Sequence, residues 1–297
     1  MKIVITGSLG NISKPLATEL VQKGHAVTVI SSKPEKQAEI EALGAQAAIG
    51  SLEDANFLAS AFNSADAVYC MIPPNLFAQP DHISYYRRIA DNYAKAIQQS
   101  GVKRVIHLSS YGAHLDKGTG IILGSHNSEQ IFLAIPGIKL TIMRPTYFYY
   151  NLLLFTEMIR HTGTIAANYG DDKIVMVSPI DIAEAVAEEI TNPGSTNKIR
   201  YVASDEQTGP EIAGIFGAAI GMPHLKWQVI SDEQMQSNYE AHGLPKHLAE
   251  ALVDIFIAVR NGKLAEEYYL NQPAALGKVK LADYAKEFAA VYHKTEK

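Results

Sequence analysis

Short, unbroken apolar runs alternate with helical stretches through the first half of the chain, and this alternation limits the fold more than any other feature. Continuous apolar runs are typical of strands that are buried on both faces, as in parallel sheets. Such runs occupy residues 3–5, 27–30, 47–49, 67–72, 105–108 and 140–143. Between them, helical stretches occupy residues 12–22, 34–43, 54–62 and 82–100. Strands separated by helices predict an α/β fold with a Rossmann-like, doubly wound parallel sheet.

The alternation ends after Arg144-Pro145. The pattern then predicts a helix over the aromatic-rich residues 146–160, and a strand followed by a capped helix over residues 175–190. In that second segment Ser178 is the expected N-cap, and Asp181 is expected to complete a capping box. A strand-like piece and further helices follow, at residues 227–230, 232–241, 246–260 and 280–294.

The break in the pattern divides the chain into two parts. We expect a Rossmann domain over residues 1–147, to which residues 171–192 return, and a smaller, mainly helical lobe over residues 148–297. A chain of 297 residues has room for both parts.

Composition and charge exclude several classes of protein. A hydrophobic content of 47% with 19% charged residues is ordinary for a globular protein. The net charge of −5 disfavours direct binding to nucleic acid, which depends on neutralising phosphates. The single cysteine, Cys70, rules out an internal disulfide and suits a reducing compartment.

Targeting signals are also not expected. The chain has no apolar run of about 18 residues that would span a membrane. Its first strand begins at residue 2, which leaves no room for a signal peptide. We therefore expect a cytoplasmic protein that does not enter membranes.

The stretch ITGSLGNISKP, residues 5–15, joins the first strand to the first helix. Gly7 permits a tight turn, and Gly10 lets the backbone approach a pyrophosphate, which the amino end of the next helix attracts. Ser13 stands where a third glycine usually lets the helix pack closely on the strand. A loop of this kind between a strand and a helix predicts a dinucleotide site.

The end of the second strand distinguishes between the two nicotinamide cofactors. A carboxylate there would bind the 2′-hydroxyl of NAD and repel a 2′-phosphate. This chain has Ser31, Ser32 and Lys33 instead, and its first carboxylate is Glu35. Two hydroxyls and an ammonium suit a phosphate, so NADP(H) is favoured over NAD(H). The alternative is that Lys33 is a solvated loop lysine.

Several segments together resemble one family. They are ITGSLGNISKPLATELVQKGHAVTVISSKPEK, GAQAAIGSLEDANFLASAFNSADAVYCMIPP, GVKRVIHLSSYGA, LTIMRPTYFYYNLL and VSPIDIAEAVAEEI. The chain looks like the NmrA-like group of atypical short-chain dehydrogenases. Within that group it is most similar to the bacterial NADPH:quinone oxidoreductase type, also in GLPKHLAEALVDIF and LGKVKLADYAKEFA near its end.

This resemblance implies a set of cofactor contacts. Ser51 and Leu52 would lie beside the adenine, and residues 71–73 would lie under the ribose and nicotinamide. Together with Ser32 from the charge argument, the expected cofactor residues are Gly7, Ser8, Leu9, Gly10, Asn11, Ile12, Ser31, Ser32, Lys33, Ser51, Leu52, Met71, Ile72, Pro73, Ser109, Ser110 and His126.

The chain departs from the family at the catalytic pair. Active short-chain dehydrogenases use Tyr-x-x-x-Lys, in which the lysine lowers the tyrosine pKa so that the phenol can pass a proton to the substrate carbonyl. Counted back from residues 143–145, the lysine position falls on His126 and the tyrosine position on Ile122. A one-residue insertion moves these positions to Ser125 and Ile121. The pair is absent in either register, as it is in the quinone oxidoreductase type, which has a histidine where His126 falls.

The candidates for catalysis are therefore His126, Tyr111 and Tyr147. Tyr111 lies off the family's tyrosine position, although it can approach the pocket. Tyr147 opens the aromatic run 147–150, which either lines a pocket for a planar substrate or packs the two lobes together.

Metal and serine chemistry are not expected. No histidine pair has the helical i, i+4 spacing with a third ligand close by, and one cysteine cannot anchor a zinc knuckle. No G-x-S-x-G elbow is present for a serine hydrolase.

Two functions fit these observations. The first is an NADPH-dependent oxidoreductase that reduces a quinone or a similar small conjugated carbonyl, bound by the lobe at residues 148–297. The second is a sensor that binds NADP(H) without turnover and reports to a partner protein, as some NmrA-like proteins do. A sugar-nucleotide epimerase or dehydratase is disfavoured because those reactions need the missing tyrosine. A homodimer is compatible with either function.

Overall fold

The computed structural model describes residues 1–78, 81–192 and 198–294, which form two compact units. Unit 1 consists of residues 1–113, 123–144 and 182–200. Unit 2 consists of residues 114–122, 145–181 and 201–297. The sequence predicts that the Rossmann domain ends at residue 147 and that the second lobe begins at residue 148. This boundary stays a prediction.

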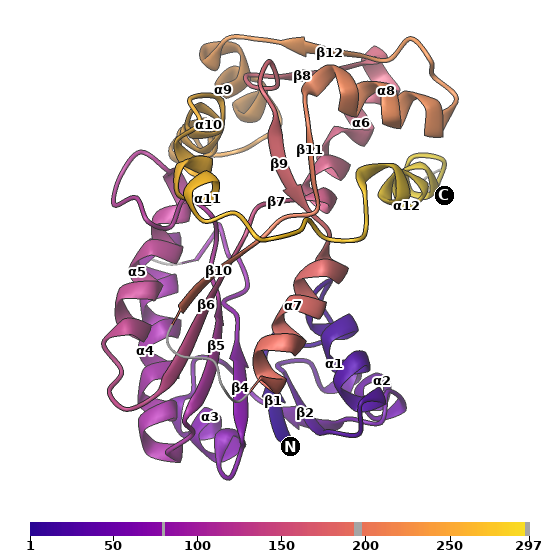
Figure 1. Ribbon diagram of the computed structural model, residues 1–297. Coiled ribbons are helices and arrows are strands. Elements are labelled where there is room, and N and C mark those ends of the chain that lie inside the picture. The colour runs from indigo at the N-terminus through magenta and orange to yellow at the C-terminus, as the bar shows by residue number, and fades with distance from the viewer. Residues whose placement is uncertain (79–80, 193–197, 295–297) are drawn as a thin grey trace. The chain divides into compact units, whose positions relative to one another are not determined.

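The central sheet has the strand order β10-β6-β5-β4-β1-β2-β3 (Figure 1). The strands are β1 (Lys2–Ile5), β2 (Ala26–Ser31), β3 (Gln46–Ile49), β4 (Ala67–Cys70), β5 (Arg104–Leu108), β6 (Lys139–Pro145) and β10 (Lys198–Val202). Every neighbouring pair from β6 to β3 is parallel. This order confirms the doubly wound fold, and it places β1 and β4 at the point where the winding reverses. In such sheets ligands bind at the carboxyl ends of the strands beside that point.

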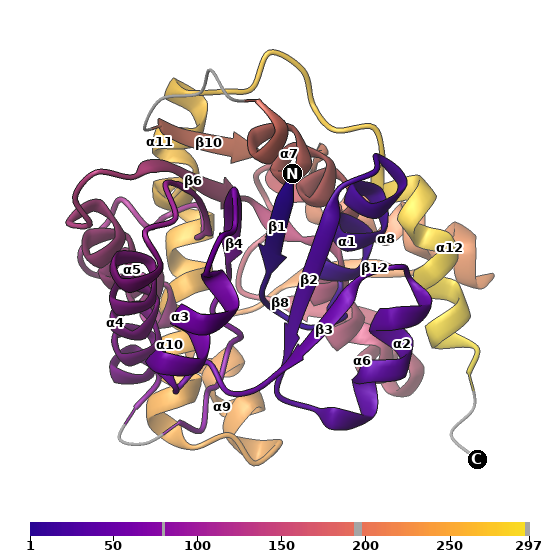
Figure 2. The ribbon, with the colours of Figure 1, turned by 90° about the horizontal axis from the view of Figure 1, so that it is seen from below.

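Helices cover both faces of this sheet (Figure 2). One face carries α1 (Ser13–Gln22), α2 (Gln37–Ala42) and α7 (Pro179–Thr191), and the other carries α3 (Ala55–Phe62), α4 (His82–Ser100) and α5 (Leu123–Leu133). Tyr93 of α4 is fully buried in the second layer, with its ring 6.4 Å from that of Phe62 and 6.0 Å from that of Phe132. The apolar strands are therefore buried from both sides, as their composition requires.

Unit 2 contains two small sheets besides its helices. One has the order β11-β9-β7 and the other pairs β12 with β8. The strands are β7 (Tyr147–Phe148), β8 (Thr164–Ala167), β9 (Ile174–Val177), β11 (Asp205–Gln207) and β12 (Lys226–Val229). The helices are α6 (Thr156–Thr162), α8 (Gly209–Ile220), α9 (Asp232–Ala241), α10 (Lys246–Arg260), α11 (Glu266–Leu270) and α12 (Leu281–Tyr292).

The helix predicted over residues 146–160 is wrong in its first part. Tyr147 and Phe148 form a strand that pairs with Met176 and Val177, and residues 149–155 form a 3-10 helix before α6 begins. Aromatic residues favour strands where a partner strand is present. That partner, β9, is too distant along the chain for a local pattern to reveal.

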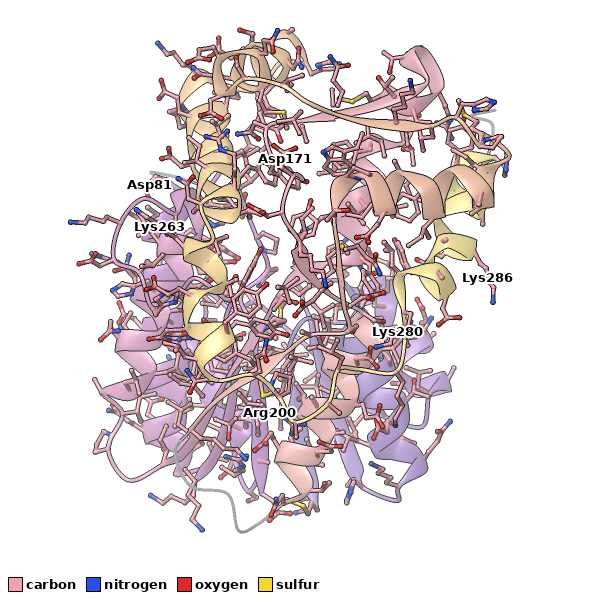
Figure 3. All side chains as sticks on the ribbon, turned by 45° about the horizontal axis from the view of Figure 1, so that its top comes forward. Asp81, Asp171, Arg200, Lys263, Lys280 and Lys286 are labelled. Carbon is pink, nitrogen blue, oxygen red and sulfur yellow. The ribbon has the colours of Figure 1, made fainter. Side chains whose placement is uncertain are left out.

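Ser178 caps α7, since its Oγ accepts the amide of Ile180 at 3.2 Å, but the capping box predicted with Asp181 is wrong, because the amide of Ser178 does not donate to Asp181. Asp181 has other partners. It accepts hydrogen bonds from the amides of residues 278–279, at 3.0 and 3.1 Å, and from Ser204 Oγ at 2.6 Å. Ser204 Oγ in turn accepts the amide of Ser178 at 2.9 Å. Lys280, labelled in Figure 3, donates to Ser204 O at 2.7 Å. The segment before α12 is therefore tied to the start of α7 by polar contacts.

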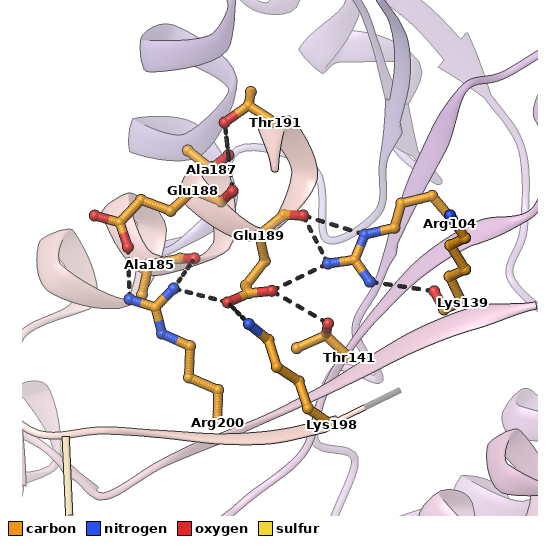
Figure 4. Close-up of polar contacts among 10 residues, drawn as sticks. All are labelled: Arg104, Lys139, Thr141, Ala185, Ala187, Glu188, Glu189, Thr191, Lys198 and Arg200. Carbon is orange, nitrogen blue, oxygen red and sulfur yellow. Dashed lines mark hydrogen bonds and ion pairs between the residues drawn. The ribbon is translucent and has the colours of Figure 1, made fainter. Parts of the chain in front are cut away.

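A buried carboxylate joins α7 to the sheet at the amino ends of the strands (Figure 4). Glu189 accepts hydrogen bonds from Arg104 at 3.1 Å, Lys198 at 2.8 Å, Arg200 at 2.9 Å and Thr141 at 3.3 Å. Its side chain is only 3% exposed. Burial alone would raise the pKa of Glu189, but the hydrogen bonds from Lys198 and Arg200 outweigh it and hold the pKa below its ordinary value.

Candidate functional site

The loop between β1 and α1 turns at two consecutive residues. Gly7 has a φ of +91° and Ser8 a φ of +53°, which is the left-handed conformation that glycine adopts most easily. The amide of Ser8 donates to Ile30 O at 3.0 Å, and the amide of Gly10 donates to Gly7 O at 3.1 Å. The loop is thereby fixed at the carboxyl end of β1 and against β2.

Ser13 stands in place of the third glycine of the dinucleotide-binding loop, and its side chain makes a hydrogen bond. Its Oγ donates to Thr6 O at 2.8 Å, and the residue is buried. The packing around it is close, because a Cβ on Gly7 would lie 2.6 Å from Ser13 Oγ and 2.9 Å from Met71 Sδ. The serine therefore fits between helix and strand, and Gly7 must stay without a side chain.

The amino end of α1 is open toward the loop. Within the described residues, no side chain caps this helix and no acidic residue lies in its first turn. The amide of Lys14 donates to Gly10 O at 3.0 Å and Pro15 has no N–H, so the N–H groups before Lys14 and the positive end of the dipole face the loop. Gly10 is exposed and carries no side chain over them. This arrangement fits the pyrophosphate of a dinucleotide.

The turn after β2 combines one buried serine with two exposed residues. Ser31 is buried, and its Oγ accepts from Ser8 Oγ at 2.9 Å and from the amide of Lys33 at 3.2 Å. Ser32 and Lys33 are exposed. Ser31 thus orders the turn by joining it to the loop, and Ser32 and Lys33 are the groups available to a ligand.

Two further lysines that the sequence argument did not identify lie close to each other beside this turn. Glu39 of α2 accepts from Lys14 of α1 at 3.2 Å and from Lys36 at 2.7 Å. Hydrogen bonds from Lys36 and Lys14 hold the pKa of Glu39 below its ordinary value. Lys14 and Lys36 therefore add positive charge close to Lys33. The glycine pattern of the loop does not predict these lysines, because they come together only in the folded protein.

The loop after β4 is held by Thr6, the residue that follows β1. The amide of Met71 donates to Thr6 Oγ1 at 2.9 Å, and Thr6 Oγ1 lies 3.4 Å from Met71 O. Met71 and Pro73 are partly exposed, and Ile72 is buried. On the loop after β3, Ser51 is exposed and Leu52 is partly exposed. The expected cofactor residues after β1, β2, β3 and β4 thus share the carboxyl edge of one sheet.

A buried ion pair that sequence reasoning missed joins α5 to β6. Glu129 accepts two hydrogen bonds from Arg144, at 2.9 and 2.7 Å, and both side chains are buried. Ser109 Oγ also donates to Glu129, at 2.5 Å. The hydroxyl of Ser109 is therefore committed to the protein, while Ser110 is partly exposed. A charged residue in the apolar sixth strand was the available signal, because a buried arginine needs a carboxylate.

His126 lies in α5 and is partly exposed. Its Nδ1 lies 2.9 Å from Ala113 O. A carbonyl can only accept, so Nδ1 carries a hydrogen and the neutral ring presents a bare Nε2. His126 therefore donates through Nε2 only when the ring is protonated. Ser125, the alternative register, is buried, and Tyr111 lies in a buried turn after β5.

Tyr147 belongs to unit 2 and lies in an aromatic cluster there. Its Oη is 3.3 Å from that of Tyr169, and the two rings meet edge to face at 6.3 Å. Burial raises the pKa of Tyr147 to about 12. Tyr169 stacks on Phe256 at 4.6 Å. Tyr147 is thus a neutral phenol that packs within its own unit.

The described residues offer neither a metal site nor a helix that could cross a membrane. Across residues 1–78, 81–192 and 198–294 no group of three His, Cys, Asp or Glu side chains is placed to hold a metal ion. Over the same residues, no helix combines the length and the apolar character that crossing a membrane requires.

Comparison with known proteins gives a family and several relatives. The model of the NmrA-like family matches residues 1–288. An NAD(P)H azoreductase of Xenophilus azovorans is 26% identical over 257 residues, which are 86% of this chain and 86% of that protein. Quinone oxidoreductase 2 of Escherichia coli is 24% identical over 269 residues, 89% of this chain and 90% of that protein.

A solved structure shares the fold over nearly the whole chain. It is the crystal structure of an NADPH-dependent quinone oxidoreductase from Escherichia coli complexed with NADPH, with a TM-score of 0.81 and 22% identity. The match covers 96% of this chain and 99% of that one. The likeness establishes the fold.

Proposed function

The chain belongs to the NmrA-like family, and from this we propose that it is an NAD(P)H-dependent oxidoreductase that reduces a quinone or a similar small conjugated carbonyl. The observation that carries the proposal is the uncapped amino end of α1 behind the turn at Gly7 and Ser8. A family relative is named as an azoreductase and another as a quinone oxidoreductase. Both names describe reduction of a conjugated acceptor, which supports the substrate class.

We propose that the cofactor residues are those after β1 to β5, with the phosphate-bearing end at Ser32 and Lys33. The loop at Gly7 to Ile12 would hold the pyrophosphate, and Ser51 and Leu52 would border the adenine. Met71, Ile72 and Pro73 would lie under the nicotinamide half. When bound, the nicotinamide supplies a hydride to the acceptor. The protein's part is to orient the two partners and to stabilise the charge that develops on the acceptor oxygen.

NADPH should bind more tightly than NADH because of the positive charge after β2. Lys33→Ala removes a charge-assisted contact to the 2′-phosphate, which costs about 1.5–3 kcal/mol. We expect Kd for NADPH to rise about tenfold or more, with little change for NADH, as measured by calorimetric titration.

Lys23→Ala is the matched control, since Lys23 is an exposed lysine at the far end of α1, paired with Glu19 at 2.6 Å. It should leave both affinities unchanged. Equal affinity of the unmodified protein for NADPH and NADH would remove the preference.

His126 is the proposed donor to the acceptor oxygen. Its Nδ1 is held by Ala113 O, so the ring is oriented and Nε2 is the donor when protonated. Losing one hydrogen-bond donor to a developing oxyanion costs about a hundredfold in many enzymes. A quinone is already a strong acceptor, so we expect His126→Ala to lower kcat about tenfold and to leave NADPH affinity nearly unchanged.

Ser125→Ala tests the alternative register in the same helix turn. If Ser125 is the residue that faces the reaction, it rather than His126 should lower turnover. If neither substitution lowers turnover, the donor lies elsewhere, and Tyr111 and Tyr147 are then the residues to change to phenylalanine.

The decisive experiment is NADPH oxidation with a panel of quinones, followed by the loss of NADPH absorbance. Turnover with a quinone supports the oxidoreductase. Tight NADP(H) binding without turnover on any acceptor would contradict it and favour the sensor, which would then need a protein partner.

A further inference from the structure

Side chains of α4 reach the loops at the carboxyl ends of two strands. The helix runs from His82 to Ser100 and is capped by Asp81, whose carboxylate accepts the amide of Ser84 at 2.8 Å (Figure 3). Most of its buried residues pack against the sheet. Its polar side chains, however, make hydrogen bonds to backbone carbonyls outside the helix.

One row of these side chains holds the loop after β4. Tyr93 Oη donates to Met71 O at 2.8 Å, and Tyr86 Oη donates to Ile72 O at 3.3 Å. His82 Nδ1 lies 3.1 Å from Asn75 O. At 3.6 residues per turn the three side chains lie within about 40° of one another around the helix. A single face of α4 thus contacts three carbonyls of one loop, those of Met71, Ile72 and Asn75.

A second contact holds the loop after β3. Asn92 Nδ2 donates to Leu52 O at 3.2 Å. Arg88 also pairs with Glu53 at 3.2 Å, but both side chains are well exposed and such a pair contributes little. Asn92 is therefore the contact that fixes Leu52.

The neighbouring helix leaves room for the row on α4. A Cβ on Gly124 of α5 would lie 2.8 Å from Cγ of Tyr86. Only a residue without a side chain allows Tyr86 to lie where its hydroxyl reaches Ile72. The position of Tyr86 is thus determined by α5 as well as by α4.

We propose that α4 is the positioning element of the cofactor site, with Tyr86 and Tyr93 holding the nicotinamide side and Asn92 holding the adenine side. This inference rests on the proposed function, because it assigns the loops after β3 and β4 to the two halves of the cofactor. The carbonyls of Met71, Ile72 and Leu52 lie in loops outside the sheet ladder, so side-chain donors set their orientation. Without these donors the loops after β3 and β4 would adopt more conformations. Cofactor binding would then have to order the loops, which lowers the affinity.

The test separates the two halves of the cofactor by using ligands that contain one or both. NADPH is compared with 2′,5′-ADP, and NADH with AMP, by calorimetric titration. Tyr86→Phe/Tyr93→Phe removes only two hydroxyls, and we expect it to raise Kd for the dinucleotides about tenfold while leaving the adenosine ligands unchanged. Asn92→Ala should raise Kd for both kinds of ligand, about three- to tenfold.

Tyr85→Phe is the matched control. Tyr85 neighbours Tyr86 on the same helix, and among the described residues no hydrogen bond of its hydroxyl is found. The single variant Tyr86→Phe, at a partly exposed residue, keeps the test available if loss of the buried Tyr93 hydroxyl prevents folding.

The outcomes distinguish this inference from the function on which it rests. Unmodified protein that binds neither dinucleotide ends the proposed function. Two results with a protein that does bind would contradict the positioning role of α4. In the first, the tyrosine variants bind every ligand as tightly as the unmodified protein does. In the second, they lose affinity for the dinucleotides and for the adenosine ligands by the same factor.

Discussion

Gly10→Val is expected to weaken NADPH binding at least about a hundredfold, the largest effect on binding that we predict for a single substitution. The new side chain would stand over the open amino end of α1, where a pyrophosphate needs direct access to backbone N–H groups. The measurement is the Kd for NADPH by calorimetric titration.

The protein itself should still fold. Gly10 is exposed, it does not have a left-handed φ, and its Cβ would meet only Gly7 O at 3.1 Å. Gly214 is the control position, because a Cβ there has nothing within 4 Å. Gly214→Val should bind NADPH normally. A folded Gly10→Val protein with unchanged affinity would remove the nucleotide site from this loop.

Glu189→Leu should destabilise the protein by about 3–5 kcal/mol, because removing one partner of a buried ion pair leaves the other uncompensated. Arg104 is 8% exposed and would lose its carboxylate. Lys198 would lose its carboxylate as well, and Arg200 would keep only its pair with Glu188. Unfolding by urea at neutral pH measures the loss.

Glu188→Gln is the matched control, since that carboxylate is 54% exposed and pairs only with Arg200 among these cations. It should cost less than about 1 kcal/mol. A Glu189→Leu protein as stable as this control would show that the network contributes nothing to folding.

The pH dependence of Glu189 has a defined sign. Its pKa is lowered in the folded state, so the carboxylate stabilises the fold above the ordinary glutamate pKa of about 4.3. That contribution is lost as the pH falls through the folded-state pKa. The difference in stability between the unmodified protein and Glu189→Leu should therefore be full at neutral pH and shrink in acid.

The sequence predicts what repeats locally. The six apolar strands and the helices between them follow from runs and spacings of adjacent residues, and residues 7–12 follow from a short loop with a known physical use. The helix α5 was not predicted, because its sequence LGSHNSEQIFL lacks a clear apolar stripe. Its polar residues face partners such as Arg144 and Ala113, which are distant in sequence.

The contacts of α4 explain why part of the site stays hidden from sequence reasoning. Tyr86, Tyr93 and Asn92 donate to backbone carbonyls, and every residue type offers a carbonyl. No pattern of side chains therefore indicates the partner. The pairing of Lys14 with Lys36 through Glu39 is hidden for a related reason, since it depends on how two helices approach each other.

Ser13 has a consequence for recognising distant members of such families. In this loop the Ser13 hydroxyl donates to Thr6 O at 2.8 Å. That hydrogen bond holds the helix close to the strand, which in other chains a glycine without a side chain allows. A search pattern that requires three glycines misses every chain that has serine in place of the third one. Allowing serine at the third position would recover them, whatever residue stands seven positions earlier, because the acceptor is a backbone carbonyl.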